Sequence, residues 1–104
     1  MTGGLTVIEI LYFDGCPNHQ PTVELTREVV AELGLEAEIR QVRVETREEA
    51  TERRFLGSPS VRVNGKDIEP EARGSEDFAL GCRLYGKSGV PPKELLVDAI
   101  REEG

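Results

Sequence analysis

The chain has 104 residues, of which 38% are hydrophobic and 32% are charged. This length and composition are typical of one soluble globular domain, so we expect a single domain over residues 1–104. Thirteen Lys and Arg residues against 20 Asp and Glu residues leave a formal net charge of -7. That charge argues against nucleic acid and against an anionic membrane as partners, because both bind basic surfaces.

Neither a membrane segment nor a signal peptide is expected. No run approaches the roughly 18 apolar residues of a membrane-spanning helix, and residues 1–10 contain Glu9 and lack a basic stretch. We therefore expect a cytoplasmic protein, in which cysteines stay reduced. The two cysteines, Cys16 and Cys82, are too few for a disulfide scaffold, so their chemistry is that of single thiols. The sequence does not indicate an oligomeric state.

The chain begins with the patterns of a buried strand and an amphipathic helix. Residues 5–13 form a nearly continuous apolar run, rich in β-branched and aromatic side chains, which predicts a strand buried on both faces. Apolar residues then recur at helical spacing over residues 17–33. Pro17 suits the first turn of a helix and Gly34 suits its C-terminal end, so these two residues predict the limits of this helix.

A second strand and a short helix are predicted next. Residues 35–44 alternate between apolar and polar side chains, as in a strand. The alternation changes phase at Gln41, which predicts either a β-bulge or a strand that begins late. Thr46 and Glu49 have the spacing of a capping box, and they predict a short helix that ends near Phe55.

Asn64 and Gly65 separate two short alternating segments, residues 60–63 and residues 66–68. An Asn-Gly pair in this position is the strongest short-range signal for a hairpin. We therefore expect two antiparallel strands joined by a tight turn.

Two further patterns follow the hairpin. Apolar residues alternate over residues 75–85 as in a strand, although Ser75 could cap a helical turn, so both structures are open there. Pro91 and Pro92 then predict the start of a last helix. Its buried side is predicted to carry Leu95, Leu96, Ala99 and Ile100.

The predicted elements follow the order β-α-β-α-β-β-α. A strand, a helix and a strand in succession form a crossover, which makes the first two strands parallel. The hairpin adds an antiparallel pair. We therefore expect an α/β fold with a mixed four-stranded sheet and helices on both faces, which buries all the apolar faces described above.

This order, with a Cys-Pro pair just after the first strand, resembles the thioredoxin-like fold in its small, glutaredoxin-sized form. Residues 15–19 (GCPNH) match the Cys-x-x-Cys motif of that family except at the last position, where His19 replaces the second cysteine. Ser58 and Pro59 stand where the family has a proline before its third strand. The resemblance implies that the Ser58-Pro59 bond is cis and that Pro59 lies against the reactive cysteine.

The resemblance covers residues 5–68 and the last helix, whereas residues 69–89 are longer than the link in the family's minimal form. It implies a thiol site at Cys16 and a backbone on either side of Pro59 that holds the substrate strand. The residues that would bind a substrate are Pro17, Ser58, Pro59 and Ser60, together with Tyr12 close to the motif.

The chemistry of Cys16 depends on its surroundings, because the thiolate, rather than the thiol, is the nucleophile and the metal ligand. Cys16 precedes a predicted helix, whose free backbone N–H groups and dipole favour negative charge. His19, one helical turn further on, could pair with the thiolate when protonated or share a metal when neutral. Asp14 opposes the thiolate if its carboxylate points inward. Alternatively, Cys16 is a small buried apolar residue and His19 faces solvent without a role.

A mixed disulfide on Cys16 needs a second thiol to resolve it, because position 19 holds no cysteine. Cys82 is the other cysteine of the chain and therefore the internal candidate. The apolar alternation around Cys82 favours core packing instead, and no pattern brings it near Cys16. External glutathione is the alternative resolving thiol, and Arg53 or Arg54 could then meet one of its carboxylates.

Three functions fit these residues. The first is a thiol–disulfide oxidoreductase that uses Cys16, acts on protein or small-molecule thiols and disulfides, and needs no cofactor, with glutathione as a possible co-substrate. The second is a soft-metal binder in which Cys16, His19 and Cys82 hold zinc, copper(I) or mercury(II). The third is a redox-inactive adaptor that keeps the fold as a binding scaffold. The resemblance favours the first.

Overall fold

The computed structural model describes residues 6–76, 78, 81, 83, 85 and 89–103. Its elements are β1 (Thr6–Tyr12), α1 (His19–Leu33), β2 (Ala37–Arg43), α2 (Arg47–Glu52), β3 (Ser60–Val63), β4 (Lys66–Asp67), the 3₁₀ turn η1 (Pro70–Ala72) and α3 (Lys93–Glu103). The predicted β-α-β-α-β-β-α order is therefore confirmed. The two structures left open for residues 75–85 fall in part outside the described residues.

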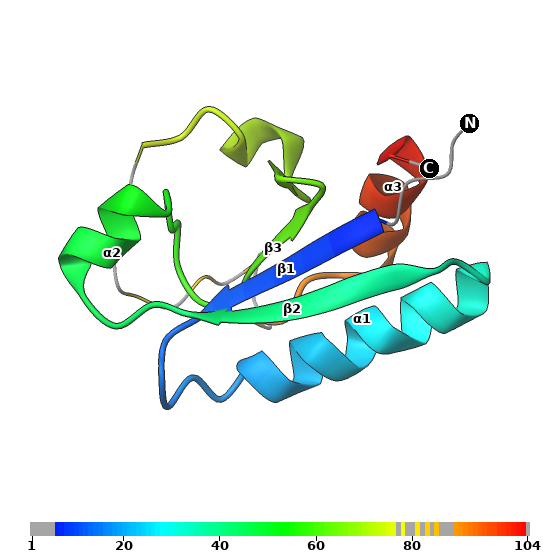
Figure 1. Cartoon of the computed structure of the whole chain (residues 1–104), viewed down its shortest axis with the longest axis horizontal. Helices are drawn as coiled ribbons and strands as arrows, with labels where there is room; N and C mark the ends of the chain where they lie inside the picture. The colour runs from blue at the N-terminus through cyan, green and yellow to red at the C-terminus, as the bar shows by residue number, and fades with distance from the viewer. Residues whose placement is uncertain are drawn as a thin grey trace.

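The four strands form one mixed sheet in the order β2-β1-β3-β4. Figure 1 shows the first three of them. β1 and β2 are parallel over their whole length. β3 runs antiparallel to β1, with Leu11 opposite Ser60, and pairs with β4 in the predicted hairpin. The loop that follows β1 and the turn that precedes β3 therefore leave the same end of the sheet.

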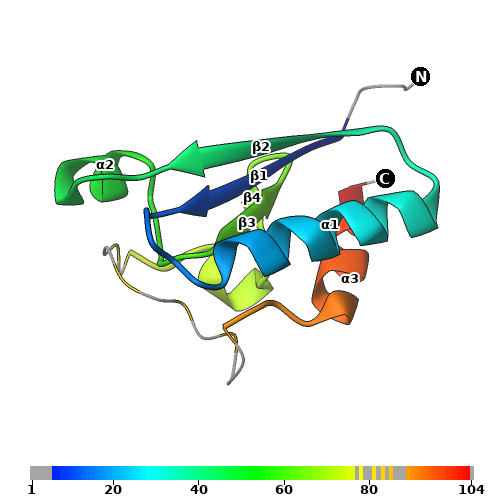
Figure 2. The same ribbon diagram turned by 90° about the horizontal axis from the view of Figure 1, so that it is seen from below.

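Helices cover both faces of the sheet, as predicted. α1 and α3 lie side by side on one face (Figure 2), where their apolar residues pack on Ile8 and Ile10 of β1. Leu11 points to the other face and packs with Ala50 of α2 and with Phe55. The larger cluster, between the sheet and the two long helices, contains Ile8, Ile10, Val23, Val29, Val61, Val63, Ile68, Tyr85, Leu96, Ala99 and Ile100.

The phase change in β2 does not mark a bulge, and the strand does not start at that point; it begins at Ala37, two residues after the start of the predicted segment. β2 pairs residue by residue with β1 from Ala37 to Arg43 without an interruption. Ile39 packs against the cluster beneath α1, whereas Val42 packs against the cluster beneath α2. The apolar residues change side because the helix that covers the strand changes. Gln41 is the point at which this happens.

α1 begins at His19, two residues after the predicted start at Pro17. A helix tolerates proline throughout its first turn, where N–H groups have no intrahelical acceptor, and Pro21 takes such a position instead. The C-terminal end is as predicted, because Gly34 adopts the left-handed conformation with φ 65°. Cys16 therefore lies three residues before the helix rather than immediately before it.

Short-range signals correctly predict α2 and the hairpin. Thr46 Oγ1 accepts a hydrogen bond from the N–H of Glu49 at 3.1 Å, and the Glu49 carboxylate accepts one from the N–H of Glu45 at 2.9 Å. α2 ends a turn earlier than predicted. Asn64 and Gly65 have φ values of 50° and 86°, which a two-residue hairpin turn of this type requires.

α3 closes the core. Leu96, Ala99 and Ile100 are buried and Leu95 is half-buried beside them, so the predicted buried side is confirmed. No helix in the described ranges is long and apolar enough to cross a membrane.

Candidate functional site

The loop between β1 and α1, residues 13–18, carries the free thiol of Cys16. Two successive turns shape it, because Cys16 N–H donates to Phe13 C=O at 3.3 Å and His19 N–H donates to Cys16 C=O at 3.4 Å. Phe13 anchors the loop by packing against the cluster beneath α2. Cys16 itself is half-buried, so it is not one of the sealed core residues.

Asp14 points outward from this loop. Its side chain is 80% exposed, and its carboxylate lies 3.8 Å from the guanidinium of Arg43. The condition under which Asp14 would oppose a thiolate on Cys16, a carboxylate that points inward, is therefore not met.

His19 is held by two residues of the sheet. Its ring stacks on the ring of Tyr12, with 3.6 Å between centroids and 6° between planes. Its Nε2 lies 2.8 Å from Oε1 of Gln41 on β2. With the amide in this orientation, a neutral ring donates from Nε2 and leaves Nδ1 as the proton acceptor. Within the described residues the ring has no hydrogen bond to Cys16, so Tyr12 and Gln41 orient it.

The Ser58-Pro59 bond is cis, which confirms the implication of the resemblance. Gly57, Ser58 and Pro59, here called the cis-proline turn, are all buried, and so is Ser60 at the start of β3. The loop of Cys16 and this turn leave the same end of the sheet. A direct contact between Pro59 and Cys16 stays a prediction.

Three residues from the C-terminal part of the chain dock on the cis-proline turn. Ser58 N–H donates to Gly81 C=O at 2.7 Å, and Arg83 N–H donates to Ser58 C=O at 2.8 Å. The Tyr85 hydroxyl donates to Pro59 C=O at 2.6 Å. We call Gly81, Arg83 and Tyr85 the docking residues.

A buried ion network anchors Arg83. Its guanidinium donates to both carboxylate oxygens of Asp67 at 2.7 and 2.8 Å, to the Glu69 carboxylate, and to Ser60 Oγ at 3.2 Å. It also lies over the ring of Tyr85, 4.6 Å from the centroid. Burial acts to lower the pKa of Arg83, but the hydrogen bonds to Asp67 and the neighbouring charges raise the pKa above its ordinary value. The guanidinium therefore stays charged although Arg83 is 9% exposed.

Two glycines allow the C-terminal segment to approach the site closely. Gly57 has a φ of 120°, and a Cβ there would lie 3.2 Å from both Arg83 Cβ and Gly81 O. Gly89 packs on the motif itself, because a Cβ there would lie 2.2 Å from Nδ2 of Asn18. Residues beyond the hairpin thus contact both the cis-proline turn and the loop of Cys16.

Cys82 lies outside the described residues, so its role as the resolving thiol stays a prediction. Its two neighbours, Gly81 and Arg83, are hydrogen-bonded to Ser58. Among the described residues no group of three or more His, Cys, Asp or Glu side chains could hold a metal ion. Of the predicted metal ligands Cys16, His19 and Cys82, the last lies outside the described residues, so the three-ligand site stays a prediction.

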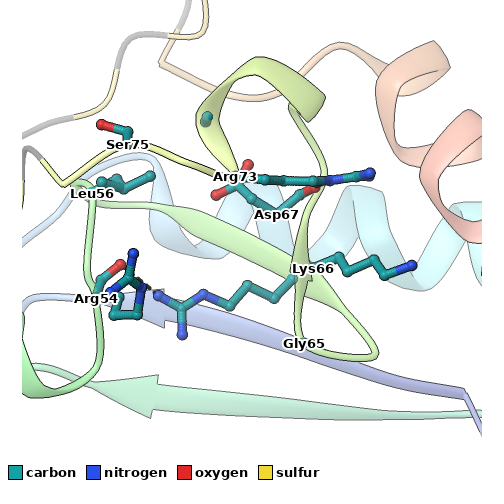
Figure 3. Close-up of a pocket in the computed structure, with 9 residues that line it drawn as sticks. Arg54, Leu56, Gly65, Lys66, Asp67, Arg73 and Ser75 are labelled. Carbon is teal, nitrogen blue, oxygen red and sulfur yellow. Dashed lines mark hydrogen bonds between the residues drawn. The ribbon is translucent and has the colours of Figure 1, made fainter.

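Arg54 lies at a different site. It lines a pocket of about 230 Å³ between the α2–β3 connection, the hairpin and η1, and no residue of the Cys16 loop takes part. Figure 3 shows Lys66 and Arg73 of this pocket directed away from Arg54. They pair instead with Glu103 at 3.2 Å and Glu102 at 2.8 Å. Arg54 thus lines a pocket that the Cys16 loop does not share, and a contact of Arg53 or Arg54 with a carboxylate of glutathione stays a prediction.

The sheet order, the cysteine loop after β1 and the cis-proline before β3 together define a thioredoxin-like α/β protein. Comparison with protein families agrees, since the family described as Thioredoxin domain (Thioredoxin_3) matches residues 6–68. The chain belongs to this family. The match contains Cys16, His19 and Pro59 and ends before the docking residues. A comparison with curated proteins gives no match.

Gln41, Asp67, Arg83 and Tyr85 are not among the predicted site residues. The sequence contains one sign of a special role for Gln41. It is a polar residue on the side of β2 that carries Ala37 and Ile39 beneath α1. No local pattern points to Asp67, whose partner Arg83 is 16 residues further along the chain.

Proposed function

We propose that this chain is a thiol–disulfide oxidoreductase whose nucleophile is Cys16. The observation that supports the proposal is the position of a free, half-buried thiol in the loop between β1 and α1 of a thioredoxin-domain chain. The nearby start of α1 presents N–H groups without intrahelical acceptors, and such groups favour negative charge. A thiolate at this place is the species that attacks disulfides.

The proposed reaction is an exchange of thiols. The Cys16 thiolate attacks one sulfur of a disulfide RS–SR′, forms the mixed disulfide Cys16–S–SR and releases R′S⁻, which takes up a proton. A second thiolate, R″S⁻, then attacks the R sulfur, forms RS–SR″ and restores the Cys16 thiolate. The sum is RS–SR′ + R″SH giving R′SH + RS–SR″, so no electrons are gained or lost overall. In this proposal His19 exchanges the proton through Nδ1.

The second thiol has two candidate sources. One is a low-molecular-weight thiol such as glutathione, which the proposed cytoplasmic location would supply. The other is Cys82, which would attack the Cys16 sulfur, release RSH and leave a Cys16–Cys82 disulfide for an external thiol to reduce. The docking of Gly81 and Arg83 on Ser58 supports the second source, since it brings the chain to the cis-proline turn on both sides of Cys82.

The test is to treat the native, reduced protein with oxidised glutathione and to map the products by intact and peptide mass spectrometry. We expect a reversible adduct or disulfide that contains Cys16. Cys16→Ser should abolish the reaction, while Cys82→Ser should leave a glutathione adduct on Cys16. Loss of the adduct upon adding a thiol completes the cycle.

The products identify the resolving thiol, and the absence of a reaction would change the proposed function. A Cys16–Cys82 disulfide in the unmodified protein identifies Cys82 as the resolving residue, whereas an adduct on Cys16 alone indicates external resolution. If Cys16 stays unmodified in the native protein while it reacts in urea, the oxidoreductase proposal is wrong. The redox-inactive adaptor would then account best for the fold, and a shift in native mass on adding zinc would favour the metal binder.

A further inference from the structure

The main chain of the cis-proline turn already has internal hydrogen-bond partners. Gly57 C=O accepts from Ser60 Oγ at 2.6 Å. The N–H and C=O of Ser58 and the C=O of Pro59 are all bonded to the docking residues, and proline has no N–H. From the Gly57 carbonyl to the Pro59 carbonyl, every main-chain donor and acceptor is therefore in use.

An extended peptide that binds by strand pairing needs these same groups. Strand addition depends on main-chain N–H and C=O groups that are free on the receiving edge. Ser58 supplies one donor and one acceptor beside the cis-proline, and both are bonded to the chain itself at 2.7 and 2.8 Å. A substrate strand could pair with Ser58 only after these hydrogen bonds break.

Packing, as well as hydrogen bonds, holds the docking residues on the cis-proline turn. Ser58 is 0% exposed, and Gly57 lacks the Cβ that would press on Arg83. Arg83 is held by the Asp67 carboxylate, and its partner Tyr85 is buried in the core cluster beneath α1 and α3. Because the anchors are buried, displacement of the docking residues costs an ion pair and apolar contacts in addition to the main-chain bonds.

The loop of Cys16 is open by contrast. Asp14, Gly15 and Pro17 are exposed, and Cys16 is half-buried among them. A ligand can therefore approach the thiol from the solvent side of the loop without any main-chain pairing at Ser58. Small thiols and disulfides can approach in this way, because they need little contact surface beyond the sulfur atom.

We propose that the docking residues close the cis-proline turn to extended peptides and thereby restrict Cys16 to low-molecular-weight thiols and disulfides. The proposal concerns substrate class and rests on the proposed function of Cys16. Arg83 and Tyr85 are in this view specificity-determining residues. They touch the turn that would otherwise hold a substrate strand, and they do not take part in the exchange itself.

The test compares two disulfides that release the same coloured thiol. One is the mixed disulfide of 5-thio-2-nitrobenzoate with cysteamine, and the other is its mixed disulfide with the central cysteine of an extended seven-residue peptide. We expect the native protein to react with the peptide probe no faster than with the small probe. Saturation with the peptide probe, at a rate tenfold or more above the small probe, would overturn the proposal.

Two variants loosen the docking residues to different extents. Tyr85→Phe removes the hydrogen bond to Pro59, and Arg83→Met removes the anchor at Asp67. We expect the rate with the peptide probe to rise about fivefold for Tyr85→Phe, the factor that one net hydrogen bond represents, and to rise further for Arg83→Met if that variant folds. The rate with the small probe should stay within about twofold. Arg101→Met, on the exposed side of α3, is the matched control. Equal changes for both probes would contradict the proposal.

A second readout does not depend on redox chemistry. In native protein labelled with ¹⁵N, we expect the amide hydrogens of Ser58 and Arg83 to exchange slowly with solvent, and a peptide with serine in place of its cysteine to leave their resonances unshifted. Fast exchange of both amides, or peptide-induced shifts at Ser58, would overturn the closure. If neither coloured probe reacts with Cys16, the proposed function fails, while this experiment still decides whether the turn is closed.

Discussion

The two loops at one end of the sheet differ in solvent exposure and in the hydrogen bonding of their main chains. The loop of residues 13–18 has exposed residues around a free thiol, and its Asp14 side chain is 80% exposed. The cis-proline turn, residues 57–59, is buried, and its main-chain groups are bonded to the docking residues. The loop of the proposed nucleophile is thus exposed, while the backbone that the family resemblance implies for substrate binding is already hydrogen-bonded within the chain.

This difference separates two tasks that the fold places side by side. Chemistry at Cys16 needs access for one sulfur atom, whereas recognition of a peptide needs a free edge. In this chain the edge at Ser58 is not free, because residues beyond the family match, which ends at Ile68, already bond to it. From the two proposals we expect the reactivity of Cys16 and its selectivity for substrates to change independently in the variants below.

The largest effect is expected for Arg83→Met, which opens the closed turn. The variant leaves the carboxylate of Asp67 buried, at 7% exposure, without its cation. Removal of one partner from a buried ion pair costs about 3–5 kcal/mol of the free energy of unfolding. Urea denaturation followed by circular dichroism measures this loss. The double variant Asp67→Leu/Arg83→Met should recover most of it, and a double variant as unstable as the single one would show that packing, rather than charge, dominates.

The next largest effect is expected for Gly57→Ala, which strains the same turn without changing any charge. Gly57 has a φ of 120°, and the new Cβ would lie 3.2 Å from atoms of Gly81 and Arg83. A strained backbone of this kind costs about 1–3 kcal/mol. Gly74→Ala is the matched control, because a Cβ at Gly74 meets nothing within 4 Å. Equal stability of the two variants in urea would show that the close approach at Gly57 is absent in solution.

A smaller effect, confined to high pH, is expected from Tyr85. Burial raises the pKa of its hydroxyl, nearby Asp67 and Glu69 raise it further, and Arg83 opposes them. An unfolded tyrosine titrates near pH 10, so above that pH unfolding releases a proton that the folded state keeps. The free energy of unfolding should therefore fall with rising pH, by up to about 1.4 kcal/mol per pH unit above pH 10.

The comparison that isolates Tyr85 is between the native protein and Tyr85→Phe. Subtraction of their unfolding free energies at pH 8 to 11 removes the contributions of lysines and other groups. The difference should be constant below pH 10 and shrink above it. A difference that stays constant throughout would show that the hydroxyl is not buried.

The smallest effect is expected for Gln41→Ala, which alters the open loop. The variant removes the hydrogen bond to His19 Nε2 at 2.8 Å, between side chains that both reach solvent. Stability should change by less than about 1 kcal/mol, while the rate of Cys16 alkylation by iodoacetamide at pH 7 should change about twofold. Gln20→Ala, exposed on α1, is the control of the same residue type. An unchanged alkylation rate would mean that the orientation of His19 does not influence the thiol.

The fold was predictable because its elements depend on local signals. The apolar run of β1, the capping box of α2 and the Asn-Gly turn of the hairpin each determine structure within a few residues. The start of α1 was misplaced because Pro17 and Pro21 both suit a first helical turn, and no local rule chooses between them. The cause of the phase change at Gln41 is not predictable from local sequence, because it depends on which helix covers each end of β2, a tertiary property.

Only the part of the candidate site that lies within the family motifs was predictable from the sequence. Cys16, His19 and the cis bond at Pro59 follow from a motif resemblance, and Tyr12 follows from its closeness to that motif. The docking residues do not, because their contacts join residues far apart in sequence, such as Arg83 and Asp67, which are 16 positions apart. An ion pair of this kind leaves no periodic pattern, and Arg83 alone resembles any charged residue in a loop.

The burial of Asp67 has a consequence for protein engineering. A shortened chain that ends soon after Ile68 would contain the whole family match, yet it would lack Arg83, the buried cation paired with Asp67, and α3, whose apolar side closes the core. The thioredoxin domain of this chain is therefore not a detachable module. Anyone who wishes to transplant it, fuse it to another protein or trim it must carry both Arg83 and α3 along.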